Sequence, residues 1–310
     1  DVYKRQPQNY VNKVDNTLLD TTIIVKSDDG AAKTAVGESE IQNNGASKRG
    51  VVNRNSLFRS SLLSENTGYN VAINKNGEIS AISISTYGNN QGAVIVNKHF
   101  GLRYIQYGST IIGQDNEKLG SAIDLNDDGD ILAVGIPNRG DTGSFEVYKL
   151  DNFNKDLMLV KNYDTTNLSE IGKSIKISAN GNILIVGAKQ NNNGKILIFK
   201  QNNGWEYSTF ITNNTTNFGK SITTSYSGDL IFVSDNTYND YKGAVYMHNY
   251  NKNENSITQN KIFVGSNSAG YFGHSISTDD TGDILVVGAY NANRVFTVSY
   301  THLRAHETVS

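Results

Sequence analysis

The sequence contains no cysteine and only two prolines in 310 residues. Without cysteine the chain has no disulfide, no thiolate metal site and no cysteine nucleophile. It also lacks an apolar run near the roughly 18 residues of a membrane span, and its net charge of −2 gives no basic field for nucleic acid. Glycine, asparagine, tyrosine and β-branched residues are plentiful, and they are typical of tight turns and pleated sheets. The composition therefore predicts an all-β protein that has no membrane span and binds no nucleic acid.

The two ends of the chain do not share the composition of the rest. Residues 1–6 read DVYKRQ and residues 299–310 read SYTHLRAHETVS. Both resemble translated sequencing-adapter sequence, and such scars are left out of fold reasoning. We therefore expect the folded part to lie between them, and the chain to be a fragment of a longer protein.

One sequence frame recurs five times between residues 68 and 298. Each copy has a leading glycine, a turn glycine nine residues later, an apolar strand, a polar loop and a second apolar strand. The leading glycines are Gly68, Gly120, Gly172, Gly219 and Gly273, and the turn glycines are Gly77, Gly129, Gly181, Gly228 and Gly282. Alternating and fully apolar runs in each copy predict three or four short antiparallel strands.

A four-stranded sheet of about 50 residues, covered on both faces by copies of itself, is a β-propeller blade. The predicted fold is therefore an all-β propeller over residues 61–298, with five recognisable blades. Two forms of the ring stay open at this point. Residues 56–63 could supply a fourth strand to the last copy and close a five-bladed ring, or the five copies could belong to an incomplete larger ring whose end blades expose sheet edges.

At these residues the chain resembles the FG-GAP repeat family, whose members form integrin-α-like propellers. The residues that carry the resemblance are Phe218-Gly219 and Phe272-Gly273, the weaker pairs Leu119-Gly120 and Ile171-Gly172, and the segments 135–137, 187–189, 243–246 and 288–290. Gly113-Gln114-Asp115 looks like the linker between repeats of environmental, virus-associated members.

The resemblance implies a non-catalytic binding or structural module, an adhesin-like or fibre component on a cell or virion surface. It implies an extracellular or virion-surface location and a protein or glycan ligand. The loops 136–143, 188–194 and 235–243 would form the binding surface. Because fold resemblance is weak evidence for function, an intracellular scaffold and a propeller domain of a glycan- or lipid-active enzyme stay as alternatives. A cluster of carboxylates that converge at the central channel with strongly perturbed pKa values would favour the enzyme.

Residues 7–60 have two interpretations. The spacing of Gly30, Gly37 and Gly45 mimics that of the later repeats, which would make the segment a degenerate blade. The alternative, which we favour, is that residues 30–76 contain copies of a short unit that resembles the head repeats of trimeric adhesins and tail fibres. One copy would be residues 72–76, and the resemblance implies a homotrimer formed through this segment.

One turn has the pattern of a calcium loop. Asp124, Asn126, Asp128 and Asp130 alternate around a turn glycine as D-x-N-x-D-G-D. Alternating oxygen ligands are what a loop needs to wrap a calcium ion. The equivalent positions of the other copies have lost these ligands, so an ordinary Asp-Gly hairpin turn is the alternative. Calcium at this loop is the one cofactor that the sequence suggests.

Arg139-Gly140-Asp141 is the tripeptide that integrins recognise in their ligands, and we expect it in an exposed loop of the second copy. No catalytic residues are predicted. Gly172-Lys173-Ser174 and Gly219-Lys220-Ser221 mimic the end of a phosphate-binding loop, but both belong to the repeat and no helix pattern follows them. His99, His248 and His274 have no metal-ligand spacing. Trp205 and Tyr207 are expected to pack between blades, with a sugar contact as the alternative.

Overall fold

The computed structural model describes residues 22–26, 31–35, 41–45, 49–53, 67–100, 103–150, 157–163, 168–266 and 270–299. The chain divides into two compact units. One contains Asp1–Leu63 and Lys98–Ile105, and the other contains Ser64–Asn97 and Gln106–Ser310.

The described part of residues 1–63 contains four short strands, whereas the strand residues within Lys98–Ile105 pair in the first sheet of the second unit, described below. The four strands are β1 (Thr22–Lys26), β2 (Ala31–Ala35), β3 (Ile41–Gly45) and β4 (Arg49–Asn53). They form two antiparallel sheets of two strands, in which β1 pairs with β4 and β2 pairs with β3. This nested order differs from a blade, where strands pair in sequence order. The fibre interpretation of this segment and the homotrimer stay predictions, and residues 1–6 lie outside the described residues.

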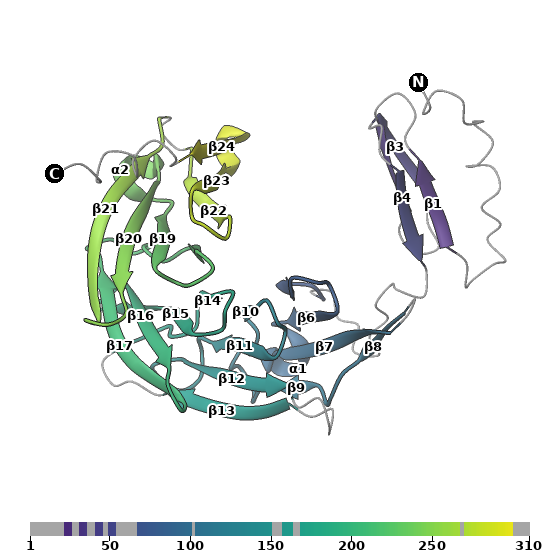
Figure 1. Cartoon of the computed structure of the whole chain (residues 1–310), viewed down its shortest axis with the longest axis horizontal. Coiled ribbons are helices and arrows are strands. Elements are labelled where there is room, and N and C mark those ends of the chain that lie inside the picture. The colour runs from purple at the N-terminus through teal and green to yellow at the C-terminus, as the bar shows by residue number, and fades with distance from the viewer. Residues whose placement is uncertain are drawn as a thin grey trace. The chain divides into compact units, whose positions relative to one another are not determined.

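The second unit confirms the all-β prediction. It is a five-bladed β-propeller whose antiparallel sheets follow one another in chain order around a common centre (Figure 1). The first sheet has β5 (Val71–Ile73), β6 (Ile79–Ile84), β7 (Ala93–Phe100) and β8 (Arg103–Gln106), with β9 (Ile111–Ile112) paired to β7. The second has β10 (Ala122–Leu125), β11 (Ile131–Ile136), β12 (Ser144–Leu150) and β13 (Leu157–Tyr163).

The remaining blades repeat this plan. The third has β14 (Ile175–Ile177), β15 (Ile183–Gln190), β16 (Asn193–Gln201) and β17 (Trp205–Thr212). The fourth has β18 (Ile222–Thr224), β19 (Leu230–Asp235), β20 (Ala244–Asn251) and β21 (Ser256–Val264). The fifth has three described strands, β22 (Phe272–Thr278), β23 (Ile284–Ala289) and β24 (Arg294–Ser299). Short helical turns are α1 (Tyr87–Asn90), α2 (Tyr238–Tyr241) and η4 (Tyr290–Ala292).

Two predicted boundaries change. Residues 72–76, read as a copy of a fibre unit, are the first strand and turn of blade 1, because β5 pairs with β6. Ser299, assigned to the C-terminal scar, belongs to β24 and faces Ile284. Residues 300–310 lie outside the described residues.

The apolar core lies between successive blades. Every residue of β11 is buried, as expected for a strand covered on both faces. One face contributes Ala133, which clusters with Ile177 and Leu184 of the third blade, and the other contributes Leu132, which clusters with Ala81 of the first. Burial of this kind, at about 25 cal/mol per Å2, is the main favourable contribution to folding.

Two apolar faces at the ends of the series remain exposed. Val71 and Ile73 of blade 1, and Ile284, Val286 and Val295 of blade 5, are between 38% and 71% exposed. In the other blades the corresponding faces are covered by the next sheet. Residues 56–63, the candidate closing strand, lie outside the described residues, so both forms of ring closure stay predictions.

The turn between the first two strands has the same construction in all five blades. The turn glycines have φ between +71° and +80°, which suits glycine because it has no Cβ. A side-chain oxygen at the start of each turn accepts a hydrogen bond from the backbone N–H five residues later. The pairs are Asn74 with Ile79, Asn126 with Ile131, Ser178 with Ile183, Ser225 with Leu230 and Asp279 with Ile284, at 2.9–3.1 Å.

The stability of the propeller should depend on pH through His248. This side chain is buried in β20, and burial lowers its pKa to about 4. Between that value and about 6.5 the unfolded chain binds a proton that the folded chain does not, so acid favours unfolding. We expect the free energy of unfolding to fall by about 2 kcal/mol between about pH 7.5 and about pH 5. Urea denaturation across this range measures it.

The control for this prediction is His248→Gln, which removes the titrating group. Its unfolding free energy should change much less over the same pH range, whatever its absolute stability. An equal pH dependence in the two proteins would show that other groups dominate.

Candidate functional site

In each blade, the loop that follows the second strand lies at one end of the sheet. The turn that precedes the second strand lies at the other end. Each loop is tied to the segment that leads into the next blade. The hydrogen bonds are Leu119 N–H to Gln91 O at 3.0 Å, Ile171 N–H to Thr142 O at 3.0 Å and Phe272 N–H to Lys242 O at 3.1 Å. We call this end the loop face. It comprises residues 86–92, 136–143, 188–194, 235–243 and 289–293 with the leading segments 113–121, 168–174, 213–221 and 270–275.

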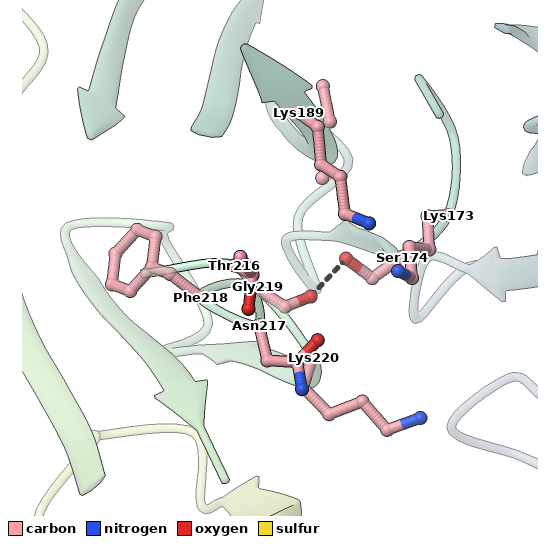
Figure 2. Close-up of a pocket in the computed structure, with 10 residues that line it drawn as sticks. Lys173, Ser174, Lys189, Thr216, Asn217, Phe218, Gly219 and Lys220 are labelled. Carbon is pink, nitrogen blue, oxygen red and sulfur yellow. Dashed lines mark hydrogen bonds between the residues drawn. The ribbon is translucent and has the colours of Figure 1, made fainter. Parts of the chain in front are cut away.

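A pocket on the loop face lies between blades 3 and 4. Figure 2 shows Lys173 and Lys189 of blade 3 near Lys220 of the segment that leads into blade 4. The Ser174 hydroxyl donates to Gly219 O at 2.7 Å across the pocket. The cavity volume is about 10 Å3, which holds one water-sized group. We call this site the lysine pocket.

The three ammonium groups of the lysine pocket have different partners. Glu170 accepts from Lys173 and from Lys189, both at 2.7 Å. Although burial opposes it, these hydrogen bonds lower the pKa of Glu170. Lys220 forms no ion pair or side-chain hydrogen bond with a described residue, and its side chain is exposed. The pocket therefore carries two positive charges in excess.

A row of aromatic side chains continues from the lysine pocket. Ring centroids are 5.2 Å apart between Tyr241 and Tyr271, 5.2 Å between Tyr271 and Tyr290, and 4.6 Å between Tyr290 and His274. We call these four residues the aromatic row. Tyr241 is 49% exposed and Tyr290 is 56% exposed, so ring surface stays open to solvent.

The lysine pocket and the aromatic row are joined through the repeat. Lys173, Lys220 and His274 each follow the leading glycine of their blade. The Ile276 N–H donates to the Ser221 hydroxyl at 3.3 Å, which ties the two leading segments together. Burial and the nearby charge of Lys220 lower the pKa of His274, which favours the neutral imidazole. The two features thus lie on adjoining segments of the loop face.

The structure places Arg139 of the Arg-Gly-Asp tripeptide in an internal ion-pair network. Its guanidinium donates to Glu117 at 2.8 Å and to Glu146 at 2.5 Å, and Glu146 also accepts from Tyr148. Burial opposes the charge of Arg139, but the two carboxylates raise its pKa overall. Gly140 and Asp141 are exposed, whereas the expected exposure of Arg139 is wrong because only 25% of its side chain meets solvent.

The predicted calcium-loop residues are used in contacts within the protein. Asp124 accepts from the Ile177 N–H at 2.8 Å and pairs with Lys176 of the next blade at 2.9 Å. Asn126 closes its turn and donates to Asp130 at 2.7 Å, while Asp128 is exposed. Within the described residues, no group of three or more His, Cys, Asp or Glu is placed to hold a metal ion. Calcium binding here stays a prediction.

Two carboxylates do converge where the turns of the blades meet. Lys75 Nζ lies 3.1 Å from Asp127 and 2.9 Å from Asp280, over the ring of Tyr226 at 5.6 Å. Hydrogen bonds with Asp280 and Asp127 raise the pKa of Lys75. Backbone hydrogen bonds link the same turns, from Lys75 N–H to Asp127 O, Asp127 N–H to Ala179 O, Asn180 N–H to Tyr226 O and Tyr226 N–H to Asp280 O. Lys75 offsets one of the two negative charges and joins blade 1 to blade 5.

The aromatic row and the partners of Arg139 were not predicted from the sequence. Trp205 is buried among residues of blades 2 and 3, as predicted, while Tyr207 is largely exposed. The two Gly-Lys-Ser copies fall at the lysine pocket because they occupy the same repeat position in neighbouring blades. Comparing the residues that follow each leading glycine would have revealed this basic run.

Comparisons with known proteins identify the fold. No family model matches the sequence, and no curated protein matches it. Among solved structures, the β-propeller domain of Cps50 (Swd1) from Myceliophteria thermophila is 13% identical, with a TM-score of 0.52 over 90% of this chain and 93% of that domain. The periplasmic gluconolactonase PpgL from Pseudomonas aeruginosa is 14% identical, with a TM-score of 0.53 over 86% and 74%.

The hydrazine synthase of Kuenenia stuttgartiensis is 12% identical, with a TM-score of 0.53 over 74% of this chain and 70% of that one. These proteins differ widely in function, so at these identities the similarity establishes the β-propeller fold alone. In the part of the chain that the structure describes, no helix has the length and apolar character needed to cross a membrane.

Replacing Asn126 by alanine should destabilise the propeller. The change removes the acceptor for the Ile131 N–H, and a buried donor left without a partner costs about 1–3 kcal/mol. Asp128→Ala, at an exposed position of the same turn, should change stability little. Thermal or urea unfolding, with and without calcium, measures both. Stabilisation by calcium that both variants abolish would instead establish the loop as a metal site.

Replacing Arg139 by alanine should cost about 2–3 kcal/mol, because it leaves two nearly buried carboxylates without their cation. This is below the cost for a fully buried pair, since Arg139 keeps partial exposure. Asp141→Ala, in the exposed part of the same loop, should leave the unfolding midpoint unchanged. Similar effects of the two substitutions would show that the ion-pair network has no special role.

Proposed function

We propose that the chain is a non-catalytic binding module that presents ligand-binding residues on its loop face. The observation that carries this proposal is a contrast between the two ends of the blades. At the turn end a side-chain oxygen at the same position, from Asn, Ser or Asp, closes the turn five times. At the loop end, equivalent positions carry chemically different residues. Those that follow the leading glycines are Tyr69, Ser121, Lys173, Lys220 and His274.

The backbone at the loop end is repeated even where the side chains differ. Two residues before the leading glycines of blades 2, 3 and 5, Lys118, Glu170 and Tyr271 have φ between +52° and +53°. The equivalent Asn217 of blade 4 does not have this left-handed conformation. A left-handed backbone at a bulky residue costs of the order of 1–3 kcal/mol, and such positions cluster at functional sites. The repeat therefore holds variable side chains in constant positions, which suits recognition by several loops at once.

The carboxylates that converge at the meeting point of the turns can be explained without an enzymatic role. A general acid or base requires a carboxylate whose proton affinity is matched to its task. Asp127 and Asp280 share the ammonium of Lys75, an arrangement that joins blades. We assign this group a structural role, and propose the loop face as the functional surface.

The proposed biological setting follows from the FG-GAP resemblance. Phe218 and Phe272, the aromatic residues of the two FG pairs, are buried in cores between blades, and Leu119 and Ile171 take the same position elsewhere. This common packing is what we expect if the repeat belongs to that family. On this basis we propose an adhesin-like or fibre component of a cell or virion surface, with a protein or glycan ligand.

A blocking experiment tests the proposal. Since the chain has no cysteine, a single introduced cysteine can be labelled with maleimide–polyethylene glycol at one site. Asn214→Cys places the polymer on the loop face, and Asn182→Cys places it at the exposed turn end of blade 3. On arrays of glycans and cell-surface proteins, the unlabelled protein should bind a ligand that polymer at residue 214 excludes. Polymer at residue 182 should leave binding intact.

Three results would contradict the proposed function. One is an array on which the unlabelled protein binds nothing, and a second is equal loss of binding from the two labelled sites. The third is catalytic turnover of a lactone, glycan or lipid substrate by the unlabelled protein. Circular dichroism of each labelled variant establishes that the propeller remains folded.

A further inference from the structure

The lysine pocket is suited to a ligand with one or two negative charges. Lys173 and Lys189 share Glu170, while Lys220 keeps its charge uncompensated among the described residues. The cavity admits a single oxygen-sized group, so a charged group would rest at its mouth between the ammonium ions. A polyanion such as nucleic acid needs a cation for every phosphate it engages. The excess of two charges here, on a chain of net charge −2, favours an isolated carboxylate.

The aromatic row is suited to the apolar face of a ring. Tyr241 and Tyr290 expose about half of their surface although both pack against Tyr271. Tyr241 and Tyr271 have φ of +62° and +53°, a conformation that bulky side chains adopt only where the surrounding structure imposes it. The fold thus tolerates backbone strain at positions that hold these rings at the surface. Tyrosine offers an apolar ring face and a hydroxyl, which together match a ligand that has both C–H and polar groups.

The lysine pocket and the aromatic row lie on adjoining segments, so a ligand that contacts both needs a negative charge and an apolar ring face. His274 follows the leading glycine of blade 5, as Lys220 does in blade 4, and its ring lies 4.6 Å from Tyr290. The hydrogen bond between Ile276 and Ser221 holds the two segments together. A ligand that spans this junction meets ammonium groups at one end and tyrosine rings at the other.

We propose that the loop face binds an acidic glycan, with a sugar carboxylate at the lysine pocket and a neighbouring sugar ring on the aromatic row. The inference rests on the proposed binding function and names the class of its ligand. A pyranose ring has an apolar C–H face for Tyr290 and Tyr271, and hydroxyl groups for the surrounding polar loops. Lys220 supplies the uncompensated charge that separates acidic from neutral glycans.

The test uses two acidic glycans from different sources, sialyllactose and a hyaluronan tetrasaccharide, with lactose and oligo-dT as comparison ligands. Calorimetry or surface plasmon resonance of the whole protein should detect at least one acidic glycan and no lactose. Which of the two binds identifies the source of the carboxylate. Lys220→Gln should weaken binding at least about fivefold, and Tyr290→Ala about tenfold. Added salt should reduce the effect of Lys220.

Matched control variants lie away from the loop face. Lys149→Gln removes an exposed lysine of β12, and Tyr207→Ala removes an exposed tyrosine of β17. Both should keep the affinity of the original protein. All four substituted side chains are exposed, so each variant is expected to fold, and its thermal midpoint establishes this.

Several outcomes would overturn the inference. They are the absence of binding to both acidic glycans at millimolar concentration, equal binding of lactose, equal loss in the control variants, and binding of oligo-dT alone. If a different ligand is excluded by polymer at residue 214 while both acidic glycans fail to bind, the proposed function stands and only this inference falls.

Discussion

The hydrogen bond that closes the turn between the first two strands is the contact on which the rest of the propeller depends. In each turn the backbone reverses direction through a glycine of positive φ. The first backbone N–H of the second strand then has no backbone acceptor on the neighbouring strand. A side-chain oxygen from the start of the turn accepts it, as Asn126 does for Ile131. Because this N–H belongs to a residue buried between sheets, an unsatisfied donor there would be costly. Repeating this closure fixes the register of the first two strands in every blade.

The same turns also join the blades to one another. The turn backbones are hydrogen-bonded from blade to blade. The side chain of Lys75, in the turn of blade 1, pairs with Asp127 in the turn of blade 2 and with Asp280 in the turn of blade 5. The strands then diverge from this meeting point, and apolar side chains fill the space between sheets. At the other end of each blade the loops are tied to the next blade through backbone groups, as in the hydrogen bond from Ile171 N–H to Thr142 O, so the side chains there are free to vary. The division between constant turns and variable loops is a consequence of where the hydrogen bonds lie.

Much of the fold could be predicted from the sequence, because the same pattern of turn glycine and apolar strand occurs five times. Glycine at a fixed spacing predicted the turns, and fully apolar runs such as residues 183–186 predicted strands covered on both faces. The functional surface was harder to predict, because its residues are those that differ between copies. Arg139 illustrates the problem: its two carboxylate partners are 22 and 7 residues away along the chain, and only the folded loop brings them together. The tripeptide pattern predicted an exposed Arg139, but its ion pairs with Glu117 and Glu146 keep most of its side chain away from solvent.

The calcium-like turn shows how one pattern can serve two physical roles. Oxygen-bearing side chains around a glycine turn suit a metal ion, yet the same side chains are needed to satisfy backbone donors of the turn. In four of the five copies the closing acceptor is retained without the full set of acidic residues, as Ser178 and Ser225 show. Turn closure is therefore the common requirement, and the acidic residues of the second blade are an addition to it. Asp124 further indicates this, since it pairs with Lys176 across the interface between blades and acts there as a contact of the fold. A residue that repeats in role but not in identity is best explained by the backbone group that it satisfies, whereas one that differs in both, such as His274, is a candidate for recognition.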